Sequence, residues 1–244
     1  MSNLVKTADF EIIDIQEDFI VVNKASGVNF HDENELGQGL FNLICQQFNQ
    51  TDTDKLFPVH RLDKMTSGLI IFARNLESAQ KFQLLFSQHD IEKYYLAISD
   101  KKPKKKQGLI KGDMEKSRRG SWKLLRTQNN PAISQFFSYA LPEGKRLYLI
   151  KPHSGKTHQI RVALSSIGAP ILGDDRYYGL SNISSTNNSK DRGYLHAYAL
   201  KFIFNGHAYH YVLPPSSGKH YLEAHTLNQL ETLQAPWLLN WPKV

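Results

Sequence analysis

The chain has 244 residues, of which 41% are hydrophobic, and its 30 Lys and Arg residues outnumber its 23 Asp and Glu residues, giving a net charge of +7. It contains no apolar run of the roughly 20 residues that a membrane helix needs, no N-terminal signal peptide and only one cysteine, Cys45, which excludes an intrachain disulfide and a cysteine zinc site. We therefore expect a cytoplasmic protein of one large domain or two small ones. The basic surplus suits a polyanionic partner such as nucleic acid, although general solubility explains it equally well.

Hydrophobic periodicity divides the chain into strands and helices. Period-two alternation and short apolar runs predict two strands within residues 10–23 and further strands over residues 69–72, 91–98, 133–139, 146–152, 195–204 and 209–213. Apolar residues at i, i+3 and i+4 predict helices over residues 38–48, 76–86, 154–168 and 221–233. Residues 179–193 are expected to form a loop, Asn205-Gly206 is a strong hairpin-turn signal, and Cys45 is interpreted as a core residue rather than a nucleophile. The mixture predicts an α/β (α+β mixed) fold on a largely antiparallel sheet with flanking helices.

A basic segment, residues 100–131, lies between two predicted strands. Its cationic residues are Lys101, Lys102, Lys104, Lys105, Lys106, Lys111, Lys116, Arg118, Arg119, Lys123 and Arg126. Such a segment could contact the phosphate backbone of a nucleic acid. The alternative is a solvated hairpin loop that repulsion between its charges keeps open.

The stretch that organises the chain is VHRLDKMTSGLIIFAR, residues 59–74. Its apolar run, residues 69–72, predicts a buried strand that is entered from a tight loop. That loop places Arg61 and Asp63 at the mouth of a rigid strand, where a carboxylate can act as a nucleophile or as a base. The alternative is an exposed loop whose charges form ordinary ion pairs.

Two later stretches also carry chemical groups. In KYYLA, residues 93–97, strand alternation sends Tyr94 and Tyr95 to opposite faces, so only one of them can share a pocket with Asp63. In GKTHQIRV, residues 155–162, Arg161 falls near a helix start, where it can hold a carboxylate bidentately or grip a phosphate. The alternatives are a core tyrosine and a surface arginine.

Motifs for metals and nucleotide cofactors are missing from the sequence. The ten histidines form neither an HExxH motif nor an (i, i+4) pair beside carboxylates. The chain also has no GxGxxG and no phosphate-loop motif. We therefore expect neither a catalytic metal nor a nucleotide cofactor.

Four ordered motifs resemble those of the RluA-type pseudouridine synthases. HRLDKMTSG resembles the family's HRLDxxTSG, KYYLA its KxYxA, GKTHQIRVA its GRTHQIRVH, and GAPILGDDRYYG (residues 168–179) its structural turn GxPILGDxxYG. Leu195-His196-Ala197 is similar to the LHA near the end of the family's catalytic domain. The chain departs from the family pattern at Lys156 and Ala163, where Arg and His are usual.

The resemblance covers roughly residues 10–215 and implies a fold, a reaction and a partner. It implies one pseudouridine synthase catalytic domain over residues 1–244, without a separate N-terminal RNA-binding domain. The implied reaction is the cofactor-free isomerisation of uridine to pseudouridine in structured RNA, either transfer RNA or ribosomal RNA. A monomer without metal is expected.

The resemblance also implies site residues. Asp63 would attack the ribose or the base, Tyr95 would stack on the uracil and act as a late base, and Arg161 would pair with Asp63 and keep it ionised. Residues matched to substrate binding are Arg61, which would enter the space that the flipped uridine leaves, and His60, Thr66, Lys156, His158 and Gln159. Lys156 keeps the charge of the usual arginine but loses its planar fork.

Two other functions fit the same pattern. One is a catalytically silent RNA-binding protein on the same fold, although the presence of Asp63 argues against a degenerate copy. The other is a glycosylase that uses Asp63 to excise a base and would release free uracil. Analysis of the reaction products separates all three functions.

Overall fold

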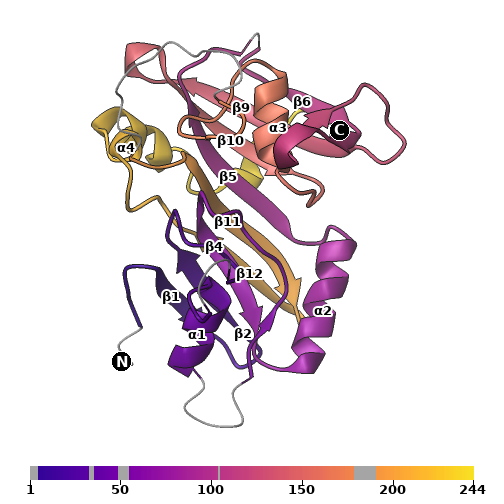
Figure 1. Ribbon diagram of the computed structural model, residues 1–244, viewed down its shortest axis with the longest axis vertical. Coiled ribbons are helices and arrows are strands. Elements are labelled where there is room, and N and C mark those ends of the chain that lie inside the picture. Colours follow the sequence, from indigo (N-terminus) through magenta and orange to yellow (C-terminus); the bar gives the residue numbers. More distant parts are fainter. Residues whose placement is uncertain (1–4, 33–35, 49–54, 104, 179–190) are drawn as a thin grey trace. The chain divides into compact units, whose positions relative to one another are not determined.

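The computed structural model describes residues 5–32, 36–48, 55–103, 105–178 and 191–244 (Figure 1). The chain divides into two compact units: unit 1 comprises residues 1–91 and 202–209, and unit 2 comprises residues 92–201 and 210–244. Lys104 of the basic segment and most of the loop expected over residues 179–193 lie outside the described residues. The single catalytic domain over residues 1–244 stays a prediction.

Unit 1 is built on an antiparallel sheet in the order β1-β2-β4, with β3 also paired to β4. Its elements are β1 (Phe10–Ile15), β2 (Phe19–Lys24), α1 (Leu40–Phe48), β3 (Phe57–Pro58), β4 (Thr66–Ala73) and α2 (Leu76–Ser87). Every residue of β4 is buried, as the apolar run at its centre predicts. Cys45 lies on α1, half-buried, and burial raises the pKa of its thiol, which agrees with its interpretation as a packing residue.

An aromatic cluster joins residues 202–209 to the rest of unit 1. The Phe19 ring of β2 meets the rings of Phe82, Phe204 and Tyr209 edge-on at centroid distances of 5.3, 5.7 and 5.0 Å. The turn between the last two rings is Asn205-Gly206, where both residues have positive φ angles, 49° and 80°. The hairpin that this dipeptide predicts is confirmed.

Unit 2 contains a second set of antiparallel strands in the order β11-β5-β10-β9-β6, and a separate two-stranded hairpin, β7–β8. Its strands are β5 (Glu92–Ser99), β6 (Gln107–Gly112), β7 (Met114–Lys116), β8 (Trp122–Leu124), β9 (Ala132–Ala140) and β10 (Arg146–Pro152). Two further strands, β11 (Leu195–Phe204) and β12 (His207–Val212), belong partly to unit 2 and partly, through residues 202–209, to unit 1. Its helices are α3 (Gln159–Ser166), α4 (Ala224–Glu231) and the short 3-10 turns η1 (Arg118–Gly120), η2 (Pro142–Gly144), η3 (Lys219–Tyr221) and η4 (Pro236–Leu238). The predicted mixed α/β fold on a largely antiparallel sheet is confirmed.

The two faces of the unit 2 sheet are covered by different elements. Helix α3 packs on β9 and β10 (Figure 1), and its Gln159 side chain donates a hydrogen bond to Ser134 of β9 at 3.0 Å. On the same strand Phe137 meets the ring of Trp241, from the C-terminal segment, at 4.8 Å. Because side chains alternate along a strand, Ser134 and Phe137 define opposite faces, which we name the helix face and the tail face.

Two sequence predictions needed adjustment. The helix predicted over residues 154–168 begins only at Gln159, because His158 has a left-handed φ of 58° that a right-handed helix cannot contain. Its predicted end is confirmed, since Gly168 has a φ of 77°. The basic segment is not one hairpin: β6 joins the main sheet of unit 2 beside β9, and only β7 and β8 form the separate hairpin.

His196 of β11 leads to a prediction about acid stability. Its ring is buried, its Nε2 donates a hydrogen bond to the Leu213 carbonyl at 2.8 Å, and burial lowers its pKa from 6.5 to about 3. Below pH 6.5 the unfolded chain binds a proton at this position that the folded chain refuses, so stability is present above pH 6.5 and is lost as the pH falls toward 3. We expect the urea midpoint of the wild type to fall more steeply over this range than that of His196→Gln.

The control for this experiment is His225→Gln, because His225 is exposed on α4. This variant should keep the pH dependence of the wild type. Identical pH profiles for His196→Gln and the wild type would show that the buried imidazole does not contribute to acid unfolding.

Candidate active site

Asp63 lies in the loop between β3 and β4, and hydrogen bonds to its own carbonyl and to the next two carbonyls fix that loop. Its carbonyl accepts the Thr66 N–H at 3.0 Å, which closes a turn. The next carbonyl, that of Lys64, accepts the Gly27 N–H at 2.8 Å, and the hydroxyl of Ser26 donates to the Met65 carbonyl at 2.8 Å. The half-buried Asp63 carboxylate therefore projects from a backbone that has little freedom to move.

A buried lysine reinforces the same loop. Lys24, the last residue of β2, is fully buried, and its ammonium donates to the carbonyls of Ala25 at 2.8 Å, Val28 at 2.7 Å and Lys64 at 3.2 Å. An ammonium has three N–H donors, and burying it is costly unless they are satisfied. Lys24 thus links the loop after β2 to the loop of Asp63 and places a positive charge beneath them.

His60 anchors the start of this loop. Its Nε2 accepts the N–H of Ile71 in β4 at 2.9 Å, so this nitrogen carries no proton. The ring also packs on Phe86 of α2, with 4.7 Å between the ring centres. The last residue pair of β3 and β4 is Pro58 with Phe72, and the imidazole bonds the residue of β4 next to that pair. Arg61, the next residue along the chain, is exposed. Whether His60 also contacts substrate stays a prediction.

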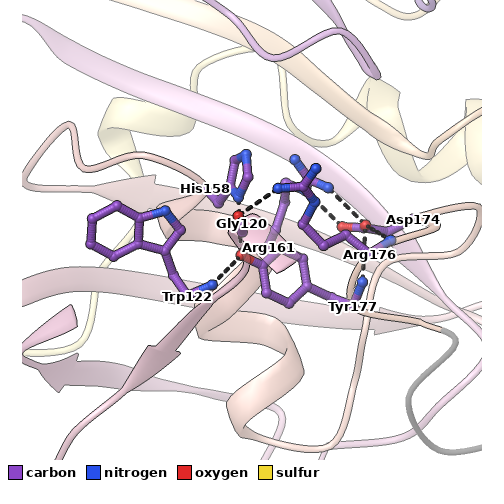
Figure 2. A network of polar contacts seen from close by, with 7 residues as sticks. All are labelled: Gly120, Trp122, His158, Arg161, Asp174, Arg176 and Tyr177. Carbon is purple, nitrogen blue, oxygen red and sulfur yellow. Dashed lines mark hydrogen bonds and ion pairs between the residues drawn. The ribbon is translucent and has the colours of Figure 1, made fainter. Parts of the chain in front are cut away.

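In unit 2, Arg161 forms a buried bidentate ion pair with Asp174 (Figure 2). Its Nε lies 2.7 Å from Oδ2 and its Nη2 lies 2.9 Å from Oδ1 of the fully buried carboxylate. The same Oδ1 accepts the backbone N–H groups of Arg176 at 3.0 Å and Tyr177 at 3.2 Å. Because a guanidinium has five N–H donors, Asp174 uses only two of those that Arg161 has.

Gln159, the first residue of α3, is held on all four hydrogen-bonding sites of its amide. Its Oε1 accepts from the Ser154 hydroxyl at 2.7 Å and the Lys156 N–H at 3.1 Å. Its Nε2 donates to the Ile133 carbonyl and the Ser134 hydroxyl, each at 3.0 Å. Gln159 therefore ties the helix start to β9, and a direct contact with substrate would require one of these bonds to break. The Lys156 ammonium donates to the Asn130 carbonyl.

The two tyrosines of β5 have different surroundings. Tyr94 is fully buried on the tail face, where its ring meets that of Trp241 at 5.7 Å, its hydroxyl donates to the Glu92 carboxylate, and burial raises its pKa. Tyr95 is half-buried, and it is aligned with Ile150 of β10, which in turn is aligned with Phe136 of β9. Aligned residues point the same way, so Tyr95 lies on the helix face, the face that α3 and Arg161 cover.

The described residues carry no sign of a metal site or a membrane span. Within them, no group of three or more His, Cys, Asp or Glu side chains is arranged to hold a metal ion. None of their helices is long and apolar enough to cross a membrane.

Residues 18–166 match the protein family described as RNA pseudouridylate synthase. The chain belongs to this family. A Haemophilus influenzae protein named "Uncharacterized RNA pseudouridine synthase" is 45% identical to this synthase, over 94% of this chain and 99% of that protein. A Rickettsia bellii "Ribosomal large subunit pseudouridine synthase C" is 32% identical over 71% of this chain, which spans 59% of that relative. Among solved structures, "Human RNA Pseudouridylate Synthase Domain Containing 1" shares the fold, with a TM-score of 0.72 and 22% identity over 96% of this chain and 97% of that one.

Family membership makes this synthase an isomerase that acts on uridines in RNA. The structure groups its sequence-predicted site residues within each unit. His60, Arg61, Asp63 and Thr66 share one loop and strand start in unit 1, whereas Tyr95, Lys156, His158, Gln159 and Arg161 belong to β5 and the α3 region of unit 2. Their roles stay predictions.

Two residues of this synthase were missed by sequence reasoning, Asp174 and Tyr177. Both lie in GAPILGDDRYYG, which was interpreted as a structural turn only. A buried carboxylate cannot be recognised from a sequence. The available signal was an Asp in a family motif that follows the motif of Arg161 along the chain. Asp174 is the acidic partner that Arg161 needs in order to be buried.

The ion pair of this synthase leads to a prediction about stability. Asp174→Asn should remove the buried carboxylate that pairs bidentately with the Arg161 guanidinium, so we expect the free energy of unfolding to fall by about 3–5 kcal/mol. Urea denaturation measures this change. The neighbouring Asp175 is exposed, and Asp175→Asn should change the free energy by about 1 kcal/mol or less. Similar losses for both variants would contradict a special role for the buried pair.

Proposed function

We propose that this synthase converts specific uridines to pseudouridine in structured RNA, with Asp63 as the nucleophile. In this reaction the bond between N1 of uracil and C1′ of ribose breaks, uracil turns and a bond forms between C5 and C1′. The hydrogen on C5 leaves as a proton, and N1 takes up a proton. The observation that carries the proposal is the rigid hold on the Asp63 loop by Gly27, Ser26 and Lys24, within the residues that match the family. A preorganised carboxylate is what nucleophilic catalysis requires.

The target uridine must leave the RNA stack before Asp63 can reach it. Flipping a base costs a few kcal/mol, so a group that fills the vacated space favours the flipped state. Arg61 is exposed and lies two residues before Asp63, and we assign it this task. Asp63 then attacks C1′ of the ribose or C6 of the base, or assists the ribose in forming a glycal as the uracil leaves.

Arg161 is proposed to act on the Asp63 carboxylate, and Tyr95 on the uracil. We assign to Arg161 the task of pairing with Asp63 and keeping it ionised. Tyr95 stacks on the uracil and accepts the proton that leaves C5. Support for a joint role comes from unit 2, where Tyr95 lies on the sheet face that α3 covers.

The RNA partner is ribosomal or transfer RNA. The Rickettsia bellii relative is named for the large ribosomal subunit, so large-subunit ribosomal RNA is the first substrate to test and transfer RNA the second. The net charge of +7 and the exposed cations of the basic segment suit phosphate contacts. We propose that the enzyme works as a cytoplasmic monomer, without a metal or nucleotide cofactor.

Asp63→Asn should abolish turnover, because the amide cannot replace the carboxylate as a nucleophile. Affinity for RNA should stay within about tenfold, because one charge contributes little beside many phosphate contacts. The assay is release of tritium from RNA that contains 5-tritiated uridine. Asp90→Asn, a change at an exposed residue of unit 1, is the control and should release tritium at the rate of the wild type.

Substantial tritium release by Asp63→Asn would remove Asp63 from its catalytic role. Product analysis of the wild-type reaction tests the two other functions. Free uracil would identify a glycosylase, and RNA binding without any product would identify a silent binding protein.

Tyr95→Phe and Tyr94→Phe form a matched pair on adjacent residues. Tyr95→Phe keeps the stacking ring but loses the hydroxyl, so turnover should fall while RNA affinity is kept. Tyr94→Phe loses the hydrogen bond to Glu92 on the tail face, so it should lower stability and leave turnover per folded molecule unchanged. Single-turnover rates together with thermal unfolding separate these effects. Equal losses of turnover in both variants would show that the assignment of Tyr95, and not Tyr94, to the active-site face of β5 is wrong.

A further inference from the structure

Tyr177 connects three parts of unit 2 (Figure 2). Its side chain is 5% exposed. Its hydroxyl accepts the backbone N–H of Trp122, in β8 of the hairpin, at 2.9 Å, and lies 3.0 Å from Nδ1 of His158, the residue before α3. Its ring lies beneath the guanidinium of Arg161, 5.1 Å from the guanidinium carbon to the ring centre. One side chain thus contacts the hairpin, the start of α3 and Arg161.

The Tyr177 hydroxyl bonds two partners. A tyrosine hydroxyl has one hydrogen to donate and lone pairs that accept. It accepts the N–H of Trp122 and also forms a hydrogen bond with Nδ1 of His158, in which the tautomer of that ring sets the donor. A phenylalanine at this position would keep the ring under Arg161 and lose both bonds. The hydroxyl can therefore be removed separately from the packing of the ring.

The hairpin packs on α3 through β8, and side chains of the turn after α3 add tethers to it. Strands β7 and β8 pair only with each other in the described part of unit 2, and an isolated two-stranded hairpin is at best marginally stable in water. A second tether runs from the side chain of Arg176 to the carbonyl of Gly120 at the hairpin tip. Gly120 has a φ of 70°, and a Cβ there would come within 2.9 Å of the Arg176 Nη1. The tip is thus shaped to receive this arginine.

The exposed side of the hairpin is suited to a polyanion. Arg118 and Arg119 are exposed at its tip, and the Lys116 ammonium lies 5.8 Å from the centre of the Trp122 ring. The Lys123 ammonium pairs with Glu115 at 2.8 Å, so the exposed positive charge of this hairpin comes mainly from Lys116 and the two tip arginines. Arginine side chains bind phosphate oxygens in a bidentate manner.

We infer that Tyr177 is a positioning residue whose hydroxyl fixes the β7–β8 hairpin, as an RNA-binding arm, against the helix that carries Arg161. The inference rests on the proposed function, because it takes RNA as the ligand of the hairpin. Phosphates bound by Arg118 and Arg119 then lie at a fixed distance from Arg161. The position of the bound RNA relative to the reacting groups is fixed in the same way. The hydroxyl acts through the hairpin and does not touch the substrate.

The test combines Tyr177→Phe with a tip variant, Arg118→Ser with Arg119→Ser. Affinity is measured by equilibrium binding of an unmodified large-subunit ribosomal RNA transcript at several salt concentrations. The tip variant should weaken binding and reduce the slope of log affinity against log salt by about 1.5–2 units, the value for two phosphate contacts. Tyr177→Phe should weaken binding about tenfold, which equals about 1.4 kcal/mol, and reduce the slope in the same direction.

The decisive comparison is the combined variant. If the Tyr177 hydroxyl positions the tip arginines for RNA binding, adding the two tip substitutions to Tyr177→Phe should lower RNA affinity little further. Tyr178→Phe is the matched control, because its hydroxyl bonds Asp100 rather than the hairpin, and it should bind RNA as the wild type does with the salt slope unchanged. Additive effects on affinity, or an unchanged salt slope in Tyr177→Phe, would overturn the inference. Both results are expected if the Tyr177 hydroxyl only stabilises the fold.

Hydrogen exchange directly measures how firmly the Tyr177 hydroxyl holds the β7–β8 hairpin. In Tyr177→Phe the amides of residues 114–124 should exchange faster, while those of β9 and β10 stay protected. Should Tyr177→Phe fail to fold, Arg176→Gln loosens the same hairpin from the Gly120 side and should accelerate the same amides. Unchanged exchange in the hairpin would overturn the inference. Tritium release by the wild type tests the proposed function separately, since binding and exchange do not require turnover.

Discussion

The buried ion pair between Arg161 and Asp174 is the interaction on which unit 2 depends. A single carboxylate oxygen, Oδ1, accepts from the Arg161 side chain and from the backbone of Arg176 and Tyr177. Removing two charges from water is repaid only when their hydrogen bonds are nearly complete. The helix motif and the turn motif, 13 residues apart in the sequence, therefore behave as one structural piece, and neither can change alone.

Unit 1 holds its loop by a different means. The backbone around Asp63 is fixed mainly through carbonyl oxygens, which receive the Gly27 N–H, the Ser26 hydroxyl and the Lys24 ammonium. Every residue has a backbone carbonyl, so only the donors depend on residue type. The most demanding donor is Lys24, whose side chain must reach the Lys64 carbonyl from the end of β2.

Much of the fold follows from local patterns, and the site follows less completely. The apolar run of β4, the alternation of β5 and the Asn205-Gly206 turn each specify one element, and the structure has each of them. The late start of α3 depends on the left-handed backbone of His158, which residue types do not reveal. The partners of Arg161 and the role of Tyr177 depend on contacts between distant segments, and periodicity carries no information about such contacts.

The placement of the tryptophans makes the hairpin open to spectroscopy. The chain has three, and the structure puts Trp122 in β8 while Trp237 and Trp241 pack near Tyr94 on the tail face. Indole emission is sensitive to the polarity around the ring, so Trp122 and the two tail-face tryptophans emit from different environments. With phenylalanine at positions 237 and 241, the remaining fluorophore would stand beside Lys116, and its intensity would follow the arm as RNA arrives and leaves.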